Sequence, residues 1–346
     1  MKTKVAILGA TGYTGIELIR YLANHPGIEI TVLTSEKYAG KKIREVFPFL
    51  DNFDFPLLPV DDPMVIKKAD FVFSCLPPEK SAEMVPEIVK NRKMVVDLSA
   101  AFRFKDKNVY KKWYHSHPYP QLLKKAVYGL PELFRDEIRN SMLVANPGCY
   151  PVSVLLPLVP LLRNSKIKLK GRIIVDSKSG VTGAGRNPNQ ELHFPEVNEG
   201  FKPYKPLAHR HQPEMEAVLG QAARKNLIVS FVPHLLPINR GILSSIYLNP
   251  SSDGDFERAV ETLRKFYSAE KFVKILQANT LPNTSCLKGS NYCHIALSYN
   301  KDHKNIIIFS AIDNLGKGAS GNAVQNMNIM LGIDETAGLE AKPVYP

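Results

Sequence analysis

The residues best suited to chemistry lie in Asn146-Pro147-Gly148-Cys149-Tyr150-Pro151, where a cysteine stands between two prolines ahead of the apolar run 152–162. Pro147 and Gly148 fit a turn, and Pro151 fits the first turn of a helix, where a missing backbone N–H is tolerated. Cys149 would then lie among unpaired N–H donors at a helix N-terminus, which favour the thiolate. The pattern predicts a nucleophilic sulfur, with a cysteine buried as a small apolar residue as the alternative.

Groups that can move protons follow in His209-Arg210-His211-Gln212-Pro213-Glu214. An imidazole near the sulfur can take its proton and later act on a hemithioacetal hydroxyl, while a carboxylate orients the ring. We therefore expect Cys149, His209, His211 and Glu214 to be the catalytic residues, and the sequence leaves open which histidine is the acid/base. The alternative for this segment is a polar helix start on the surface.

A glycine loop near the amino terminus indicates a dinucleotide. The apolar run 4–8 leads directly into Gly9-Ala10-Thr11-Gly12-Tyr13-Thr14-Gly15, after which apolar residues recur at helical spacing. A second apolar run, 28–33, completes a strand, helix and strand unit, in which a pyrophosphate can rest on helix N–H groups. The loop residues expected to bind the cofactor are Gly9, Thr11, Gly12, Tyr13, Thr14 and Gly15. The alternative is a tight turn that lets helix and strand pack closely.

The residues after the second strand bear on the choice between NADP and NAD. The chain has Thr34-Ser35-Glu36-Lys37 there, followed by Lys41 and Lys42. Ser35 and Lys37 are expected to hold a 2′-phosphate, which favours NADP (NADPH), whereas Glu36 would suit a free ribose.

Several further segments could hold an anionic ligand. Ser177 to Arg186 follows the apolar strand 172–176 and is rich in glycines, hydroxyls and cations, so its backbone could approach an anion closely. Arg103 lies just past a strand end, where ligands gather in open α/β sheets. We expect Arg103, Asn146, Arg186 and Arg240 to be the substrate-binding residues, although exposed arginines are common on any surface.

The order of elements predicts two domains. Strands at 70–74 and 94–98 with a helix at 79–90 between them continue the alternation of a parallel sheet. After Cys149 the chain reads as strands at 172–176, 228–232, 242–248, 294–299 and 306–311, with a helix at 255–268. We expect an α/β protein, with a Rossmann-type dinucleotide-binding domain (1–147 with 314–346) and a mixed α+β domain with a largely antiparallel sheet (148–313).

Composition limits the classes of function. The chain has 346 residues, 44% of them hydrophobic, four cysteines and a formal net charge of +12. Its lysines form short clusters without a basic tract, so an anionic small molecule is expected and a nucleic acid is not. The longest apolar region is too short for a membrane span, and the cysteine spacing predicts neither a metal site nor disulfides. A cytoplasmic location is expected.

Six segments, taken in order, resemble the N-acetyl-gamma-glutamyl-phosphate reductases of the semialdehyde dehydrogenase superfamily. They are Gly9 to Gly15, Tyr38 to Lys41, Asn146 to Pro151, Ser179 to Arg186, His209 to His211 and Asn314 to Ala319. Two positions depart from the family pattern: Ala101 stands where aspartate is usual before Phe-Arg, and Glu36 stands where arginine often follows the serine.

The resemblance implies an NADPH-dependent enzyme of arginine biosynthesis. It would reduce N-acetyl-L-glutamyl 5-phosphate, an acyl phosphate, to the 5-semialdehyde through a thioester on Cys149, with release of phosphate. It also implies an acid/base in His209-Arg210-His211, a cofactor near Ser179, Gly180, Asn314 and Gly316, and a homodimer or homotetramer. The alternatives are a reductase of aspartyl phosphate or of a carrier-bound aminoadipyl phosphate, and a dinucleotide-binding regulator without catalysis.

Overall fold

The computed structural model describes residues 2–302 and 304–345. The chain divides into two units, Met1–Gly148 with Ala319–Glu340, and Cys149–Gly318 with Ala341–Pro346. Residues 314–318 and 341–346, which the sequence placed in the first domain, therefore belong to the second unit. The reason is hydrogen bonding: the Asp313 carboxylate accepts from the backbone N–H groups of Leu315 and Gly316, and Val344 N donates to Lys288 O.

The first unit is built on a parallel sheet of seven strands in the order β3-β2-β1-β4-β5-β7-β6. Its strands are β1 (Thr3–Leu8), β2 (Ile28–Thr34), β3 (Leu57–Leu58), β4 (Phe71–Ser74), β5 (Met94–Asp97), β6 (Val127–Tyr128) and β7 (Leu143–Ala145). Residues Val5 to Leu8 are fully buried, because both faces of a parallel sheet are covered by helices. The order reverses at β1, and the edge next to such a reversal is where α/β sheets bind ligands.

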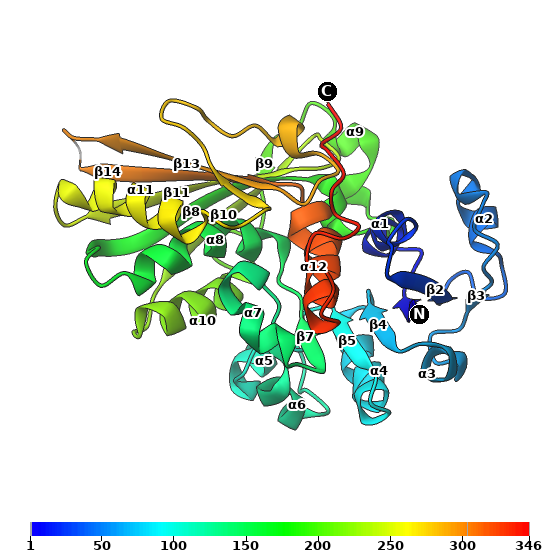
Figure 1. Ribbon diagram of the computed structural model, residues 1–346. Helices are drawn as coiled ribbons and strands as arrows, with labels where there is room; N and C mark the ends of the chain where they lie inside the picture. Colours follow the sequence, from blue (N-terminus) through cyan, green and yellow to red (C-terminus); the bar gives the residue numbers. More distant parts are fainter. Residues whose placement is uncertain (1, 303, 346) are drawn as a thin grey trace. The chain divides into compact units, whose positions relative to one another are not determined.

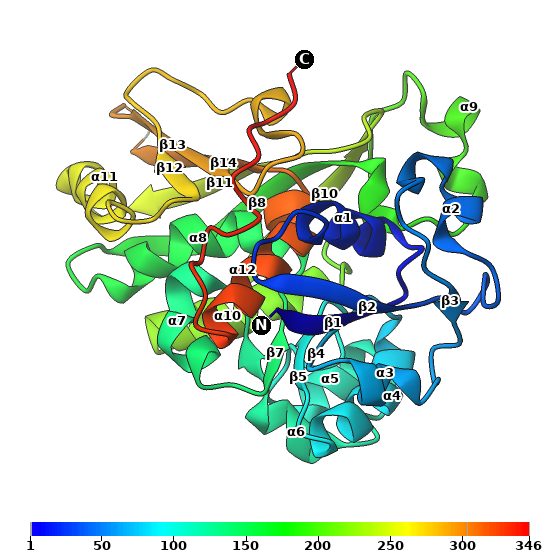
Figure 2. The same ribbon diagram turned by 45° about the vertical axis from the view of Figure 1, so that its right-hand side comes forward.

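Helices cover both faces of this sheet (Figure 2). They are α1 (Tyr13–Leu22), α2 (Ile43–Val46), α3 (Met64–Lys68), α4 (Pro78–Lys90), α5 (Lys107–Trp113), α6 (Pro120–Lys125), α7 (Pro131–Arg139) and α12 (Gly321–Met330). Apolar side chains of α3, α4, α5 and α6 share one core with the sheet, while α1 and α12 lie on the other face. The strand, glycine loop and helix expected at the amino terminus are thus present.

The second unit is built on a mixed sheet in the order β12-β13-β14-β11-β8-β10-β9. Its strands are β8 (Leu169–Gly180), β9 (Lys202–Pro203), β10 (Val229–Leu236), β11 (Ile242–Pro250), β12 (Val273–Ile275), β13 (Cys293–Asn300) and β14 (Asn305–Ile312). The central pairs β13·β14, β14·β11 and β11·β8 are antiparallel, whereas β8·β10 and β12·β13 are parallel. The expected largely antiparallel sheet is confirmed.

Four helices accompany the second sheet: α8 (Cys149–Arg163), α9 (Phe194–Val197), α10 (His211–Ala223) and α11 (Gly254–Phe266). Of these, α8 and α11 lie along one face, below the sheet in Figure 1. Residues of β8 alternate accordingly: Ile173 and Val175 are buried, whereas Ile174 is 46% exposed. The whole of α8 between Tyr150 and Leu161 is buried, so the helix that begins with Cys149 forms the centre of this core.

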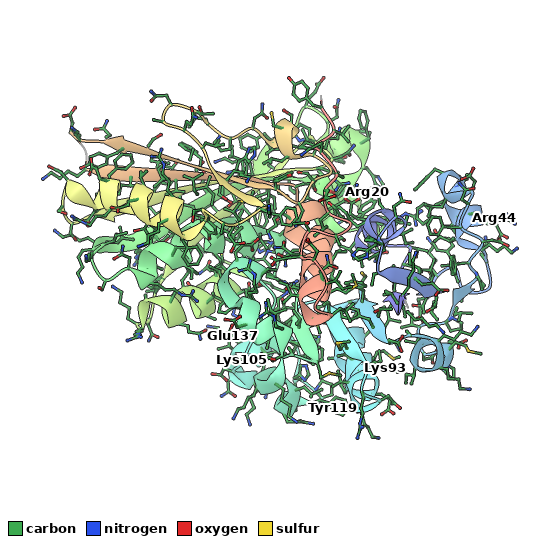
Figure 3. The ribbon with its side chains drawn as sticks, viewed as in Figure 1. Arg20, Arg44, Lys93, Lys105, Tyr119 and Glu137 are labelled. Carbon is green, nitrogen blue, oxygen red and sulfur yellow. The ribbon has the colours of Figure 1, made fainter. Side chains whose placement is uncertain are left out.

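Surface cations of the first unit are spread over separate elements. Figure 3 labels Arg20 on α1, Arg44 on α2, and Lys93 and Lys105 in loops. Arg20 pairs with Glu17 at 2.6 Å and Arg44 with Asp54 at 3.2 Å. These four cations thus lie on separate elements, and two of them are paired with carboxylates.

Candidate active site

Cys149 is the first residue of α8 and is half-buried. Pro151 occupies the first turn, where its missing N–H breaks no helical hydrogen bond. Backbone N–H groups at a helix N-terminus lack partners within the helix and point at whatever lies before it, which favours a thiolate there. The local geometry therefore suits a nucleophilic sulfur.

Tyr150, the neighbour of Cys149, lies at the centre of an aromatic cluster. Its ring meets the rings of His209, His211 and Phe231 edge-on, with centroid distances of 5.6, 5.9 and 5.2 Å. The two histidines contact each other with their ring centroids 4.8 Å apart. Both predicted acid/base candidates are thus gathered against the first turn of the cysteine helix.

A second tyrosine, Tyr204, joins this cluster. Its hydroxyl donates to Tyr150 Oη at 3.1 Å and lies 3.4 Å from His209 Nε2. Burial raises the pKa of both tyrosine hydroxyls, and the negative charge of Cys149 raises each pKa further. Both hydroxyls therefore stay protonated near neutral pH.

The two histidines differ in their surroundings. His209 Nδ1 accepts a hydrogen bond from the backbone N–H of His211 at 3.1 Å. Burial, with the charges of Lys205 and Arg210, lowers the pKa of His209 to about 4. His209 is therefore a neutral imidazole near pH 7.

His211 begins α10, and Glu214 lies one turn later on the same helix. Residues three apart on a helix share a face. Glu214 is 2% exposed, so its carboxylate is held inside the second unit on the side that carries His211.

Arg240 is held by Asp313, a carboxylate that the sequence did not single out. Arg240 Nε lies 2.9 Å from Asp313 Oδ2, and Nη2 lies 3.1 Å from Oδ1. Asp313 is fully buried and also accepts from the backbone N–H groups of Leu315, Gly316 and Gly289. The sequence predicted that Arg240 contacts the substrate directly. In the structure its guanidinium is already paired with the Asp313 carboxylate, so a substrate contact would be made by a paired arginine.

The glycine-rich segment after Asp313 packs on the nucleophile. Asn314 is buried, accepts from Gly241 N at 2.8 Å and donates to Thr182 Oγ1 at 2.9 Å. Gly318 lies within a π-helical turn, Gly316–Ser320, and a Cβ at position 318 would lie 2.9 Å from Cys149 Cβ. Only glycine fits there, because real Cβ atoms do not approach so closely.

Arg103 and Asn146, both predicted to bind substrate, have internal partners in the first unit. Arg103 donates from Nε to Asn146 O and from Nη2 to Leu98 O, each at 2.9 Å. Asn146 is 1% exposed, and its Oδ1 accepts from Asn322 and Asn326 on α12 at 2.8 and 3.1 Å. A direct substrate contact does not fit Asn146. Both side chains instead stabilise the turn before Cys149. Arg103 is held there by main-chain carbonyl oxygens, because Ala101 has no carboxylate with which to pair.

The segment Ser179 to Arg186 begins with the last two residues of β8 and continues beyond the strand. Ser179 is buried, and its hydroxyl donates to Gly180 O at 3.0 Å. Ser179 also lowers the pKa of Tyr150, against the larger effect of burial. A Cβ at Gly180 would lie 2.6 Å from Asn239 O, so close backbone packing explains this glycine. Arg186 is exposed and follows Gly185, whose φ is +87°. The structure brings Ser179 to the cluster around Tyr150 and leaves Arg186 on the surface.

The glycines of the dinucleotide loop have different reasons to be glycine. Gly9 has a φ of +75°, and a Cβ there would lie 2.9 Å from Cys75 O. A Cβ at Gly15 would lie 2.6 Å from Gly9 O and from Ala10 Cα. At Gly12, which is the N-cap of α1, φ is −76° and a Cβ would meet only Gly9 O, at 3.5 Å. Neither conformation nor packing therefore requires glycine at position 12.

The surroundings of Gly12 fit a pyrophosphate. No side chain caps α1, so the first-turn N–H groups of Tyr13 and Thr14 face the space over Gly12, as at anion sites on helix N-termini. Thr11 Oγ1 and Ser35 Oγ are 2.8 Å apart, and Ser35 Oγ also accepts from Tyr38 N at 3.3 Å. Ser35 thus joins the loop to the end of β2, while the exposed Lys37 has its ammonium 5.3 Å from the Tyr38 ring.

Sequence reasoning missed Tyr204 and Asp313. Asp313 carried a local signal, because an aspartate ahead of a glycine-rich segment commonly bonds the N–H two residues on, as it does with Leu315 at 2.8 Å. No local sequence pattern indicated a role for Tyr204. It reaches Tyr150 because Tyr204 N donates to Pro233 O and so fixes the segment along β10, which is a pairing between distant parts of the chain.

Within residues 2–302 and 304–345, no group of three or more histidine, cysteine or acidic side chains is arranged to hold a metal ion. The same residues contain no helix that is both long and apolar enough to cross a bilayer.

Two family descriptions match the chain in order. The semialdehyde dehydrogenase NAD binding domain matches residues 4–141, and the semialdehyde dehydrogenase dimerisation domain matches residues 149–314. Among solved structures, aspartate semialdehyde dehydrogenase II from Vibrio cholerae superimposes with a TM-score of 0.74 at 19% identity, covering 96% of this chain and 99% of that one. The Candida albicans aspartate semialdehyde dehydrogenase solved with NADP gives 0.73 at 16%, covering 96% and 99%. These structures share the fold.

Curated relatives are much closer in sequence. N-acetyl-gamma-glutamyl-phosphate reductase from Magnetococcus marinus is 50% identical over 345 residues, and that from Geotalea daltonii is 48% identical over 345, each covering 99% of both chains. The Thermoanaerobacter enzyme of the same name is 47% identical over 344 residues, again covering 99% of both. With identity of this level along its whole length, the chain belongs to the N-acetyl-gamma-glutamyl-phosphate reductase family of semialdehyde dehydrogenases.

Proposed function

We propose that the protein catalyses NADPH-dependent reduction of N-acetyl-L-glutamyl 5-phosphate to N-acetyl-L-glutamate 5-semialdehyde, with release of phosphate, in arginine biosynthesis. The observation that carries the proposal is the position of Cys149 at the start of α8, next to Tyr150, whose hydroxyl bonds Tyr204 and whose ring contacts both imidazoles. Family membership along the whole chain supports the substrate, and the open, uncapped glycine loop around Gly12 supports the cofactor.

Cys149 carries out the covalent chemistry. Its thiolate forms a bond to the acyl carbon, and phosphate leaves with the electron pair of the broken carbon–oxygen bond and takes up a proton. Bound NADPH supplies the hydride that reduces the resulting thioester. N–H groups at the start of α8 stabilise the hemithioacetal oxyanion, and breakage of the carbon–sulfur bond returns the thiolate and releases the aldehyde.

His211 is assigned the proton transfers. His209 is kept neutral by burial and by the charges of Lys205 and Arg210, whereas His211 starts α10 next to Tyr150 with Glu214 one turn away. His211 therefore gives a proton to the hemithioacetal oxygen and removes it when the carbon–sulfur bond breaks.

A burst experiment tests the covalent step. Wild-type protein mixed with the acyl phosphate without NADPH should release about one phosphate per Cys149, and Cys149→Ser should release none, because only a thiolate forms the thioester. In the reverse direction, phosphate-dependent reduction of NADP by the semialdehyde should disappear in the same variant while NADPH affinity stays within about twofold of wild type. Turnover by Cys149→Ser would refute the mechanism, and equal rates with aspartyl phosphate would refute the substrate.

The second sheet also supports a homo-oligomer, and family membership supports a cytoplasmic location. Ile174 is 46% exposed on the face of β8 opposite the buried Ile173 and Val175, and the matching family description is that of a dimerisation domain. We infer a homodimer or a dimer of dimers formed through this face. Ile174→Asp should lower the mass measured by light scattering to that of the monomer, and an unchanged mass would place the interface elsewhere.

A further inference from the structure

A chain of hydrogen bonds with a single direction runs past the nucleophile. Tyr204 Oη donates to Tyr150 Oη at 3.1 Å, and Tyr150 Oη in turn donates to the carbonyl oxygen of His234 at 3.4 Å. A hydroxyl has one hydrogen, so the oxygen of Tyr204 is left to accept. The group within reach is His209 Nε2, 3.4 Å away.

The other end of the chain favours the same tautomer of His209. Its Nδ1 accepts from the backbone N–H of His211 at 3.1 Å. A neutral imidazole carries one hydrogen, which must then be on Nε2, the atom that faces Tyr204. A second proton, on Nδ1, would oppose the hydrogen of His211 N and break that contact.

The groups around His209 also favour its neutral imidazole. Tyr204 and Lys205 come from the segment before it, Arg210 and His211 follow it, and Tyr150 faces it from α8, next to Cys149. Burial and the two cations lower the pKa of His209 to about 4. His209 therefore stays uncharged while the reaction proceeds near neutral pH.

We propose that Tyr204 is a positioning residue for the reaction, whose hydroxyl holds His209 as the Nε2–H imidazole and thereby leaves His211 as the histidine of the pair that exchanges protons. The inference rests on the proposed function. The His209 ring anchors the backbone N–H of His211 through Nδ1, so loss of the Tyr204 acceptor frees the ring to turn or to change tautomer. Either change shifts the position of His211 at the start of α10.

Tyr204→Phe tests the proposal, because it removes the hydroxyl and keeps the ring. We expect kcat to fall about tenfold, the loss for one hydrogen bond in the site, while KM for the acyl phosphate stays within about twofold. The acid limb of the pH profile should shift, because His209 is no longer confined to one tautomer. Tyr299→Phe is the matched control: its hydroxyl donates to Asp253 at 2.9 Å on the surface of the second unit, and it should behave as wild type.

Nitrogen-15 spectra of histidine-labelled protein give a readout that needs no substrate. Wild-type His209, assigned with His209→Asn, should show the Nε2–H tautomer from pH 8 to pH 5, and Tyr204→Phe should show a mixture or the other tautomer. Tyr150→Phe removes the acceptor of the Tyr204 hydrogen, which can then turn to His209 Nε2. This variant should therefore also show a mixture or the other tautomer, and it replaces the first test if Tyr204→Phe fails to fold.

The possible outcomes distinguish a failure of the Tyr204 proposal from a failure of the proposed function. An unchanged tautomer and pH profile in Tyr204→Phe overturn the positioning role, even if kcat falls, because the tyrosine would then act through shape or substrate contact alone. The Nδ1–H tautomer in wild type, or an unchanged tautomer in Tyr150→Phe, overturns the direction of the chain. Absence of acyl-phosphate reduction by wild-type protein would refute the proposed function while the tautomer spectra still report on Tyr204.

Discussion

Gly318→Ala should displace Cys149 and so lower its activity, although the cysteine itself is unchanged. A Cβ at position 318 would lie 2.9 Å from Cys149 Cβ, 3.2 Å from Asp313 O and 3.3 Å from Ile312 Cδ1. Carbon atoms in contact prefer about 3.5–4.0 Å, so the two Cβ atoms must separate by roughly 0.6–1 Å. The other two contacts obstruct retreat of the new methyl group, so Cys149 at the start of α8 must move.

The displacement sets the expected magnitudes. A misplacement of about 1 Å at a reacting group lowers the rate roughly 100-fold, and overpacking of this kind destabilises by about 1–3 kcal/mol. At about 2–4 °C per kcal/mol, the melting temperature should fall by about 2–12 °C. The assays are kcat for acyl-phosphate reduction, the rate of Cys149 alkylation and thermal melting of the folded variant.

Gly254→Ala is the matched control for this prediction. A Cβ at position 254 would also meet an atom at 2.9 Å, but that atom is Nη1 of Arg258, the end of a flexible side chain that can swing away. Its kcat should equal that of wild type. A kcat within twofold of wild type for Gly318→Ala, or an equal loss in Gly254→Ala, would refute the packing argument.

Three further variants test other parts of the structure. Gly12→Ala should raise the NADPH dissociation constant at least about tenfold with little change in stability, whereas Gly15→Ala, whose Cβ would lie 2.6 Å from backbone atoms, should lower stability by about 3 kcal/mol. Fluorescence titration and urea unfolding distinguish them, and tight NADPH binding by Gly12→Ala contradicts the pyrophosphate site. Asp313→Asn should lower the free energy of unfolding by about 3–5 kcal/mol, because Arg240 then loses its buried counterion; a change below about 1 kcal/mol speaks against that pair. The pKa of His209 is lowered to about 4 in the folded protein, so the unfolded chain binds the proton more readily and stability falls as pH decreases from about 6.5 towards 4. Between pH 7 and pH 5 this contributes about 2 kcal/mol, which should be missing from the pH dependence of unfolding in His209→Asn.

The sequence was informative wherever local pattern and function coincide. The apolar run and glycines at 4–15 predicted β1, the loop and α1, because a parallel strand buried on both faces and a pyrophosphate turn each impose a local pattern. The prolines around Cys149 predicted the start of α8 for the same reason. Boundaries were less reliable: residues 314–318 belong to the second unit because Asp313 binds their backbone, and no local signal says which domain a loop will join.

The sequence by itself determined the chemistry available to this protein: a cysteine at a helix start, two histidines with an acid, and a glycine loop for a dinucleotide. Tertiary structure decided how these groups are used. It left Asn146 and Arg103 as braces, made Arg240 the counterion of Asp313, and placed Tyr204 against the histidines. Such roles depend on which hydrogen-bond partner lies opposite after distant strands have paired, and side-chain types and spacing carry no information about that.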